Sequence, residues 1–208
     1  MISAALVLLA ALQLVLAAIA LRAGPAGLLT ALLGCALAYD SAVVSVGVLL
    51  GEGPALETLS VGRFVAHAVG TPLVLPCAIL ALRGGRASLA GGWVIVVSLI
   101  GLGCATTLSG LHLRSRTWAD TLRYADAEPG AFPVAAVLAI VILLAIGVAA
   151  WIRLRTPWIA LGALAVLACS AGAFAAPPLG NVGEALMLAG LVVELRRRRS
   201  VRPAAAEH

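Results

Sequence analysis

Residues 56–82 read LETLSVGRFVAHAVGTPLVLPCAILAL, an apolar run that is interrupted by Ser60, Arg63, His67 and Thr71. These four side chains are three or four residues apart, so they lie on one face of a helix. An arginine and a histidine are costly to hold in hydrocarbon, and inside membranes they almost always face protein and serve a site. The stripe therefore predicts a polar site within a membrane-embedded bundle.

The composition of the whole chain supports a membrane location. Hydrophobic residues make up 62% of the 208 residues and charged residues 11%, against about 25% charged residues in soluble domains. The mean hydropathy is +1.11. All 14 basic side chains other than histidine are arginine, and without a lysine amine the chain cannot form a Schiff base with a carbonyl cofactor such as retinal.

Breaks at glycine, proline and arginine divide the chain into seven apolar stretches of about the 20 residues that cross a bilayer. Residues in strands alternate with period 2, and the chain lacks that pattern. The sequence thus predicts an all-α, seven-span transmembrane helix bundle at residues 1–195. The spans are 2–21, 26–50, 56–82, 87–112, 131–152, 157–176 and 180–195.

The arginines predict the orientation of the bundle. With the amino terminus outside, ten arginines fall in cytoplasmic segments and three in outer segments, as the positive-inside rule requires. The basic tail 196–208 is then cytoplasmic, where it anchors the topology and offers a surface to anionic lipid headgroups. We expect the inner membrane of a bacterium as the location.

The outer segment 113–130 is the one extended connection between predicted spans. Trp118, Leu122 and Ala125 would share a face if this segment were a helix. The segment is then either a short interfacial helix that forms a lid over a cavity, or a solvated connector.

Depth along the helices predicts which polar groups meet. At about 1.5 Å per residue, Asp40 and His67 both lie about 15 Å below the outer surface, on neighbouring spans. Arg63 lies one turn nearer the outside, and Glu184 lies near the start of the last span. We expect the outer half to hold the site, the inner half to be nearly bare, and spans 1, 5 and 6 to face lipid. The candidate residues are Tyr39, Asp40, Ser60, Arg63, His67, Thr71, His112, Asn181 and Glu184.

Each candidate also has a structural interpretation. Asp40 and Arg63 would form a buried ion pair, His67 would bond a carbonyl that a proline leaves free, and Glu184 would stabilise a helix start. We expect no metal, because the two histidines of the spans lack the spacing of known metal motifs. No cofactor is expected either.

Three classes of function fit these residues. The first is an enzyme that acts on a lipid or isoprenoid substrate by acid/base chemistry, with Asp40 and His67 transferring protons. The second is a transporter of protons or small solutes, and the third is a non-catalytic membrane subunit or assembly factor. Membrane lipids are the expected partners, and nucleic acid is not.

Overall fold

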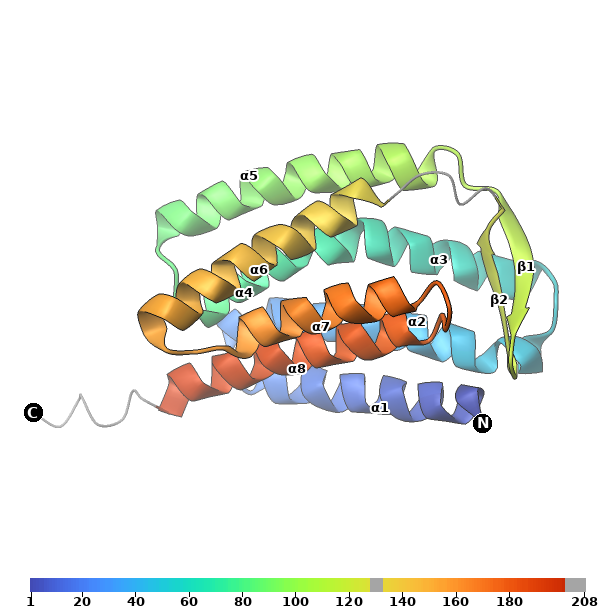
Figure 1. Ribbon diagram of the computed structural model, residues 1–208, viewed down its shortest axis with the longest axis horizontal. Coiled ribbons are helices and arrows are strands. Elements are labelled where there is room, and N and C mark those ends of the chain that lie inside the picture. Colours follow the sequence, from blue (N-terminus) through green and yellow to red (C-terminus); the bar gives the residue numbers. More distant parts are fainter. Residues whose placement is uncertain (128–132, 201–208) are drawn as a thin grey trace, which may run out of the picture.

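The computed structural model describes residues 1–127 and 133–200, which form helices lying alongside one another and a β-hairpin across one end (Figure 1). The helices are α1 (Ile2–Leu21), α2 (Pro25–Leu50), α3 (Pro54–Gly70), α4 (Val74–Ala81), α5 (Arg86–Gly103), α6 (Val134–Leu154), α7 (Trp158–Gly172) and α8 (Leu179–Ser200). A 3₁₀ turn, η1 (Thr71–Leu73), joins α3 to α4, and a π-helical turn, η2 (Cys104–Leu108), extends α5. The strands are β1 (Leu113–Trp118) and β2 (Thr121–Asp126).

Five helical segments among the described residues are long and apolar enough to cross a membrane: Ile2–Leu21, Pro25–Leu50, Pro54–Ala81, Arg86–Leu108 and Val134–Leu154. Helix α7 is apolar but shorter, and α8 continues into the arginine run. Large apolar side chains are exposed on the outside of the bundle, such as Leu8 at 72% and Val94 at 69%. Such a surface is consistent with a membrane location, and the prediction of a mostly helical fold with several helices able to span a membrane is confirmed.

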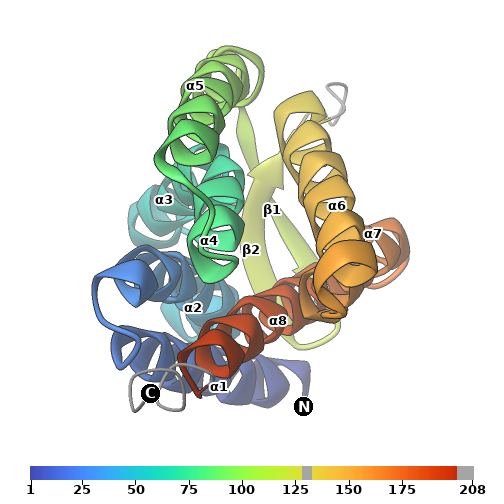
Figure 2. The same cartoon turned by 90° about the vertical axis from the view of Figure 1, so that its left-hand side faces the viewer.

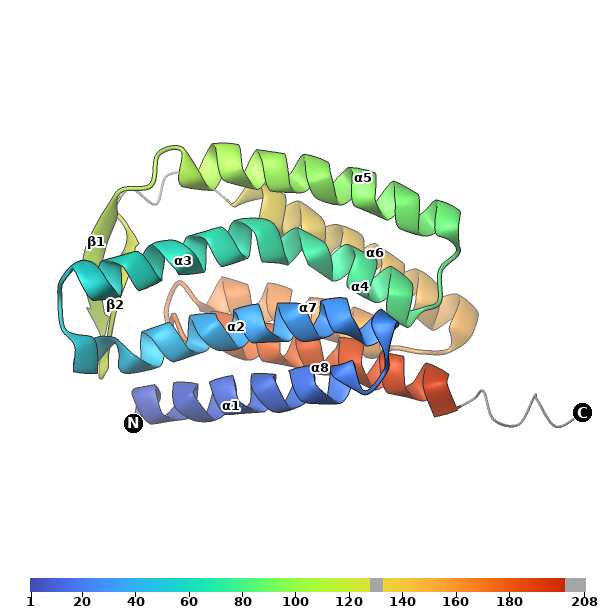
Figure 3. The same cartoon turned by 180° about the vertical axis from the view of Figure 1, so that it is seen from behind.

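Glycine and proline set the ends of the first helices. Gly24 has φ 74° and Gly51 has φ 70°, in the left-handed region that favours glycine. Pro25 and Pro54 then occupy the first positions of α2 and α3, where a missing N–H costs no hydrogen bond. These turns bring α1, α2 and α3 side by side (Figure 3).

The predicted span 56–82 is not one regular helix. It consists of α3, η1 and α4, and the 3₁₀ turn includes Pro72. Proline lacks an N–H and its ring clashes with the preceding turn, so it breaks the ladder of helical hydrogen bonds. The break lies four residues beyond His67 and separates the polar stripe from the apolar inner segment.

The alternative of a short interfacial helix over 113–130 was wrong for residues 113–126. They form an antiparallel hairpin, in which Leu113 pairs with Asp126 and Trp118 with Thr121. The two-residue turn is Ala119 and Asp120, and Ala119 adopts φ 51°. Residues 128–130 of this segment, the start of the predicted span 131–152 and residues 201–208 of the tail lie outside the described residues.

The hairpin packs against α2 and α3 at the end of the bundle where α2 ends and α3 begins. We call this end, which the sequence predicts to lie outside, the outer end, and the opposite end the inner end. Leu122 lies in a small core with Val43 and Leu56. A Cβ on Gly47 would lie 1.7 Å from the carbonyl oxygen of Leu122, so only glycine allows β2 to approach α2 this closely. The hairpin is therefore a fixed cap on the outer end.

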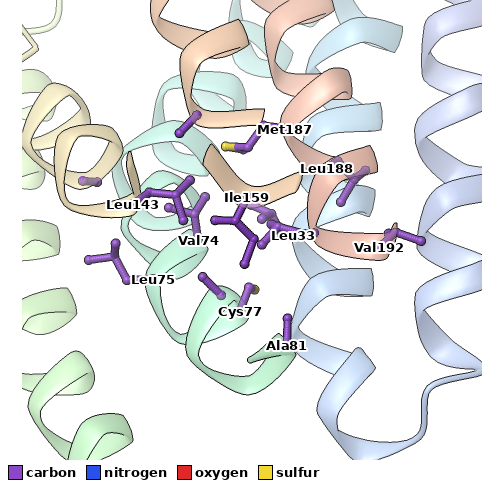
Figure 4. Packing of buried hydrophobic residues seen from close by; sticks show 14 of the residues in the cluster. Leu33, Val74, Leu75, Cys77, Ala81, Leu143, Ile159, Met187, Leu188 and Val192 are labelled. Carbon is purple, nitrogen blue, oxygen red and sulfur yellow. The ribbon is translucent and has the colours of Figure 1, made fainter. Parts of the chain in front are cut away.

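The larger apolar core lies inward of the predicted site. Leu33, Val74 and Leu188 belong to it (Figure 4). They lie seven, seven and four residues inward along the chain from Asp40, His67 and Glu184, respectively. We expect this packing, at the close density of protein interiors, to separate the polar stripe from the inner end.

The inner half is not bare of ionisable groups, contrary to our expectation. Glu194 on α8 is fully buried. Its carboxylate accepts hydrogen bonds from Thr156 and from Nε of Arg198, the latter at 2.7 Å. Arg83 donates to the backbone carbonyl of Arg198 at 2.6 Å. We call Arg83, Thr156, Glu194 and Arg198 the inner cluster.

Candidate functional site

Asp40 is the centre of the polar residues in the outer half. Its side chain is only 4% exposed. Nε of Arg63, from α3, donates to Oδ1 of Asp40 at 2.6 Å, and the Asn181 amide, from α8, donates to Oδ2. Three helices therefore meet at one carboxylate, and the predicted convergence of Asp40, Arg63 and Asn181 is what the structure shows.

His67 lies between two carboxylates from different helices. Its Nε2 is 3.4 Å from Oδ1 of Asp40, and its Nδ1 is 3.6 Å from Oε1 of Glu184. Each ring nitrogen thus faces its own acid. An imidazole in this position can receive a proton at one nitrogen and release one at the other. We call Asp40, Arg63, His67, Asn181 and Glu184 the outer cluster.

The charges of the outer cluster balance when either His67 or Glu184 carries a proton. With the proton on His67, two carboxylates face one guanidinium and one imidazolium; with the proton on Glu184, the charges of Asp40 and Arg63 balance each other. The second oxygen of Glu184, Oε2, is buried without a hydrogen-bond partner in the described residues. An unpaired buried acceptor is costly, and a bound proton or a polar ligand atom would relieve that cost.

Two cavities meet at His67. One, of about 150 Å³, is lined by α2, α3, α4, α6, α7 and α8 and has Asp40, His67 and Glu184 on its wall. The other, of about 280 Å³, lies between α3, η2 and the start of α6. Both include His67, Pro133 and Ala136. His67 keeps 37% of its side chain exposed, so the imidazole is accessible to a molecule in either cavity.

The walls of both cavities are mainly apolar. Leu37, Val74, Ile140 and Val166 line the first, and Phe64 and Ala135 line the second. Viewed along the helices, α5 and α6 stand apart from each other (Figure 2), and both contribute residues to the lining of the second cavity. We had expected predicted spans 5 and 6, which correspond to α6 and α7, only to face lipid. Instead, α6 lines both cavities and α7 lines the first. Sequence periodicity could not reveal this, because nearly every residue of these helices is apolar.

Of the remaining candidates, Thr71 adjoins the first cavity, whereas Ser60 and Tyr39 do not. Thr71 lines the first cavity. Ser60 is buried and its Oγ accepts a hydrogen bond from the backbone N–H of Tyr124 at 3.4 Å. Tyr39 donates to the carbonyl of Leu59 at 2.8 Å, so its hydroxyl connects α2 to α3. Ser60 and Tyr39 position the helices and do not contact the cavity.

His112 does not join the outer cluster. It is exposed in the turn before β1, and its Nδ1 lies 3.0 Å from the carbonyl oxygen of Gly110. The helical segment predicted over 87–112 ends at Leu108 instead, so His112 lies beyond the end of the helix.

A buried polar pair next to Asp40 was missed from the sequence. Ser41 Oγ donates to Oε1 of Gln13 at 2.9 Å, and the Asn181 amide donates to Ser41 Oγ at 3.3 Å. Gln13 is fully buried, on a helix that we expected only to face lipid. A glutamine in an otherwise apolar span was the available signal.

One atom from each of Asp40, His67 and Glu184 lies within 4.8 Å of the others, which is close enough for a shared metal ion. Two observations fit a metal poorly. The two carboxylates face different nitrogens of His67, whereas a mononuclear ion would bind one nitrogen. Both oxygens of Asp40 already accept hydrogen bonds, one from a guanidinium whose positive charge would repel a cation. The geometry suits proton transfer better.

Comparison with protein-family models, with curated proteins and with solved structures found no match for this chain.

Proposed function

We propose that this chain is an enzyme of a bacterial inner membrane that acts on a lipid or isoprenoid substrate by acid/base chemistry. In this proposal the bundle spans the bilayer seven times, with the amino terminus and the hairpin outside and the carboxyl terminus in the cytoplasm. The apolar parts of the cavity walls would hold the apolar part of the substrate, and His67 would exchange protons with it.

The observation that carries this proposal is the position of His67, an accessible imidazole between two carboxylates at the wall of an apolar cavity. General acid/base catalysis requires such a group within reach of the substrate. Asp40 would orient the imidazole and stabilise its protonated form, and Glu184 would accept or return the proton. Arg63 would orient a polar headgroup, and Asn181 would hold Asp40 in place.

Transport is supported less well than catalysis. A proton or solute pathway needs polar groups along its length, whereas Leu33, Val74 and Leu188 pack on the inner side of the outer cluster. A purely structural role is also supported less well, because a cluster that only holds helices together needs no adjoining cavity.

The test is a comparison of lipids before and after exposure to the protein. Purified protein would be incubated with a bacterial total lipid extract in deuterated water, and the lipids analysed by mass spectrometry. We expect a lipid species to change in mass, through bond cleavage or through uptake of deuterium during a proton-transfer step such as isomerisation. His67→Gln and Asp40→Asn should abolish the change while leaving the folding yield close to that of the wild type.

His112→Gln is the matched control, because it removes a histidine outside the cluster, and it should behave as the wild type. Proton flux into vesicles that depends on His67, without any change in the lipids, would favour transport and overturn the proposal. Loss of folding in both His67→Gln and Asp40→Asn would assign these residues a structural role.

A further inference from the structure

The two faces of the hairpin differ in chemistry. The register places Arg116 directly opposite Arg123, so the two side chains project from the same face. Because successive side chains of a strand alternate, Arg114 and Trp118 share that face, whereas Leu122 and Tyr124 lie on the other. All three arginines of the predicted outer segments thus lie on one face, which we call the arginine face.

Arg123 is the member of this face that is partly buried. Its side chain makes no hydrogen bond or ion pair within residues 1–127 and 133–200, and the residue opposite it is another arginine. Burial and the neighbouring Arg63 lower the pKa of Arg123, and Asp40 partly offsets this. Like charges directly opposite each other destabilise a strand pair, so an anion at this position would be stabilising.

Arg123 lies at the outer end of the helix that carries Arg63. The backbone N–H of Tyr124, the next residue, donates to Oγ of Ser60, which is one helical turn from Arg63. Arg63 uses Nε to bind Asp40, and its two terminal nitrogens have no hydrogen-bond partner within the described residues. Guanidinium groups with free N–H donors bind phosphate oxygens, often through two parallel hydrogen bonds.

We propose that Arg63 and Arg123, assisted by Arg116, bind the phosphate group of a phosphorylated lipid whose apolar part lies in the cavities beside His67. This inference rests on the proposed function, because it assigns a headgroup to the substrate of the same site. A phosphate monoester or diphosphate carries negative charge that would balance the positive charge of the arginine face. The hairpin then acts as the part of the site that recognises the headgroup.

The test compares three probes by isothermal titration with the full-length protein in a neutral detergent: farnesyl phosphate, farnesol and inorganic phosphate. We expect farnesyl phosphate to bind about tenfold or more tightly than farnesol, in line with the strength of a charge-assisted hydrogen bond. Inorganic phosphate, which lacks an apolar part, should bind more weakly than farnesyl phosphate.

Two variants assign the effect to the arginines. Arg123→Gln should remove most of the preference for farnesyl phosphate over farnesol, and Arg123→Lys should restore part of it, since lysine keeps the charge but not the planar fork. Arg86→Gln, which removes an exposed arginine at the opposite end of the bundle, should leave the preference unchanged.

Equal binding of farnesyl phosphate and farnesol would overturn the inference while leaving the proposed function intact. So would an unchanged preference in Arg123→Gln. If inorganic phosphate binds as tightly as farnesyl phosphate, the arginines bind free phosphate and the assignment to a lipid is wrong. If the lipids change in a way that depends on His67, but the Arg123 variants bind all three probes as the wild type does, the headgroup assignment is wrong and the proposed function stands.

Discussion

The outer and inner clusters hold similar residues in different surroundings. Each has a buried carboxylate bound to an arginine, Asp40 with Arg63 and Glu194 with Arg198. Two cavities adjoin the outer cluster through His67. Neither of these cavities includes a residue of the inner cluster, where Glu194 is fully enclosed by protein. A buried ion pair alone therefore does not indicate a site, whereas one that supports an accessible titratable group does.

The largest effect on stability should come from the inner cluster. Glu194→Ala leaves Arg198 and Thr156 without their shared acceptor, and breaking a buried charge pair costs about 3–5 kcal/mol. We expect a lower free energy of unfolding, measured by titration with a denaturing detergent, and unchanged binding of lipid in the variant that folds. Glu57→Ala, which removes an exposed carboxylate, should change stability by no more than about 0.5 kcal/mol. Altered lipid selectivity in Glu194→Ala would mean that the two clusters are coupled.

The next largest effect should come from Gly47, which supports the outer end. Gly47→Ala places a methyl group against the carbonyl of Leu122, and such overpacking costs about 1–3 kcal/mol. The hairpin should detach before the helices unfold, and faster trypsin cleavage at Arg114, Arg116 or Arg123 would report this. Gly101→Ala, at a position with open space around it, is the control. Equal cleavage rates in both variants would show that the hairpin is held elsewhere.

His67→Gln should have a smaller effect on stability than either change. The imidazole lies 3.4 and 3.6 Å from its acids, whereas Nε of Arg198 lies 2.7 Å from Glu194. The amide of a glutamine also keeps a hydrogen-bond donor for one of the two carboxylates. The same variant should lose the change in lipids described above. A large loss of stability together with unaltered lipid chemistry would reverse the contrast between the two clusters and place the functional site elsewhere.

The smallest effect should be that of acid on the hairpin turn. Hydrogen bonds from the Met1 amino group and from the backbone N–H groups of Ile2 and Ser3 lower the pKa of Asp120 to about 2. A carboxyl group with a lowered pKa stabilises the folded state above its ordinary pKa of 3.8, and this contribution is lost as the pH falls to about 2. Hydrogen exchange at Ile2 and Ser3 should therefore speed up in that range, beyond the intrinsic effect of pH. Asp120→Asn should show no such dependence, while Glu57→Gln should keep it.

The helices could be predicted from the sequence because apolar runs and glycine–proline breaks are local features. The meeting of Asp40 with His67 could also be predicted, since depth along a helix follows from residue count. The hairpin could not: its turn, Ala119 and Asp120, lacks the asparagine–glycine signal of tight turns, and Trp118, Leu122 and Ala125 fit helical spacing as well. Polar segments of this length carry no periodicity strong enough to decide.

The inner cluster and the cavity walls depend on tertiary packing. Glu194 lies near the end of the predicted span 180–195, and only the continuation of α8 to Ser200 brings Arg198 one turn below it. The contributions of α6 and α7 to the cavity depend on how apolar helices rotate against one another. No single residue type reports that rotation in spans made mainly of alanine, leucine and valine.

The bond between Asp120 and Met1 joins residues 119 positions apart. A ribosome must therefore release more than half of the chain before this contact can form, after the first four helical segments have been made. The cap over the outer end is one of the last parts of the amino-terminal half to be completed during synthesis. Until then Ser60, the first residue of the polar stripe, lacks its hydrogen bond from the backbone N–H of Tyr124, and this end of the stripe stays uncovered.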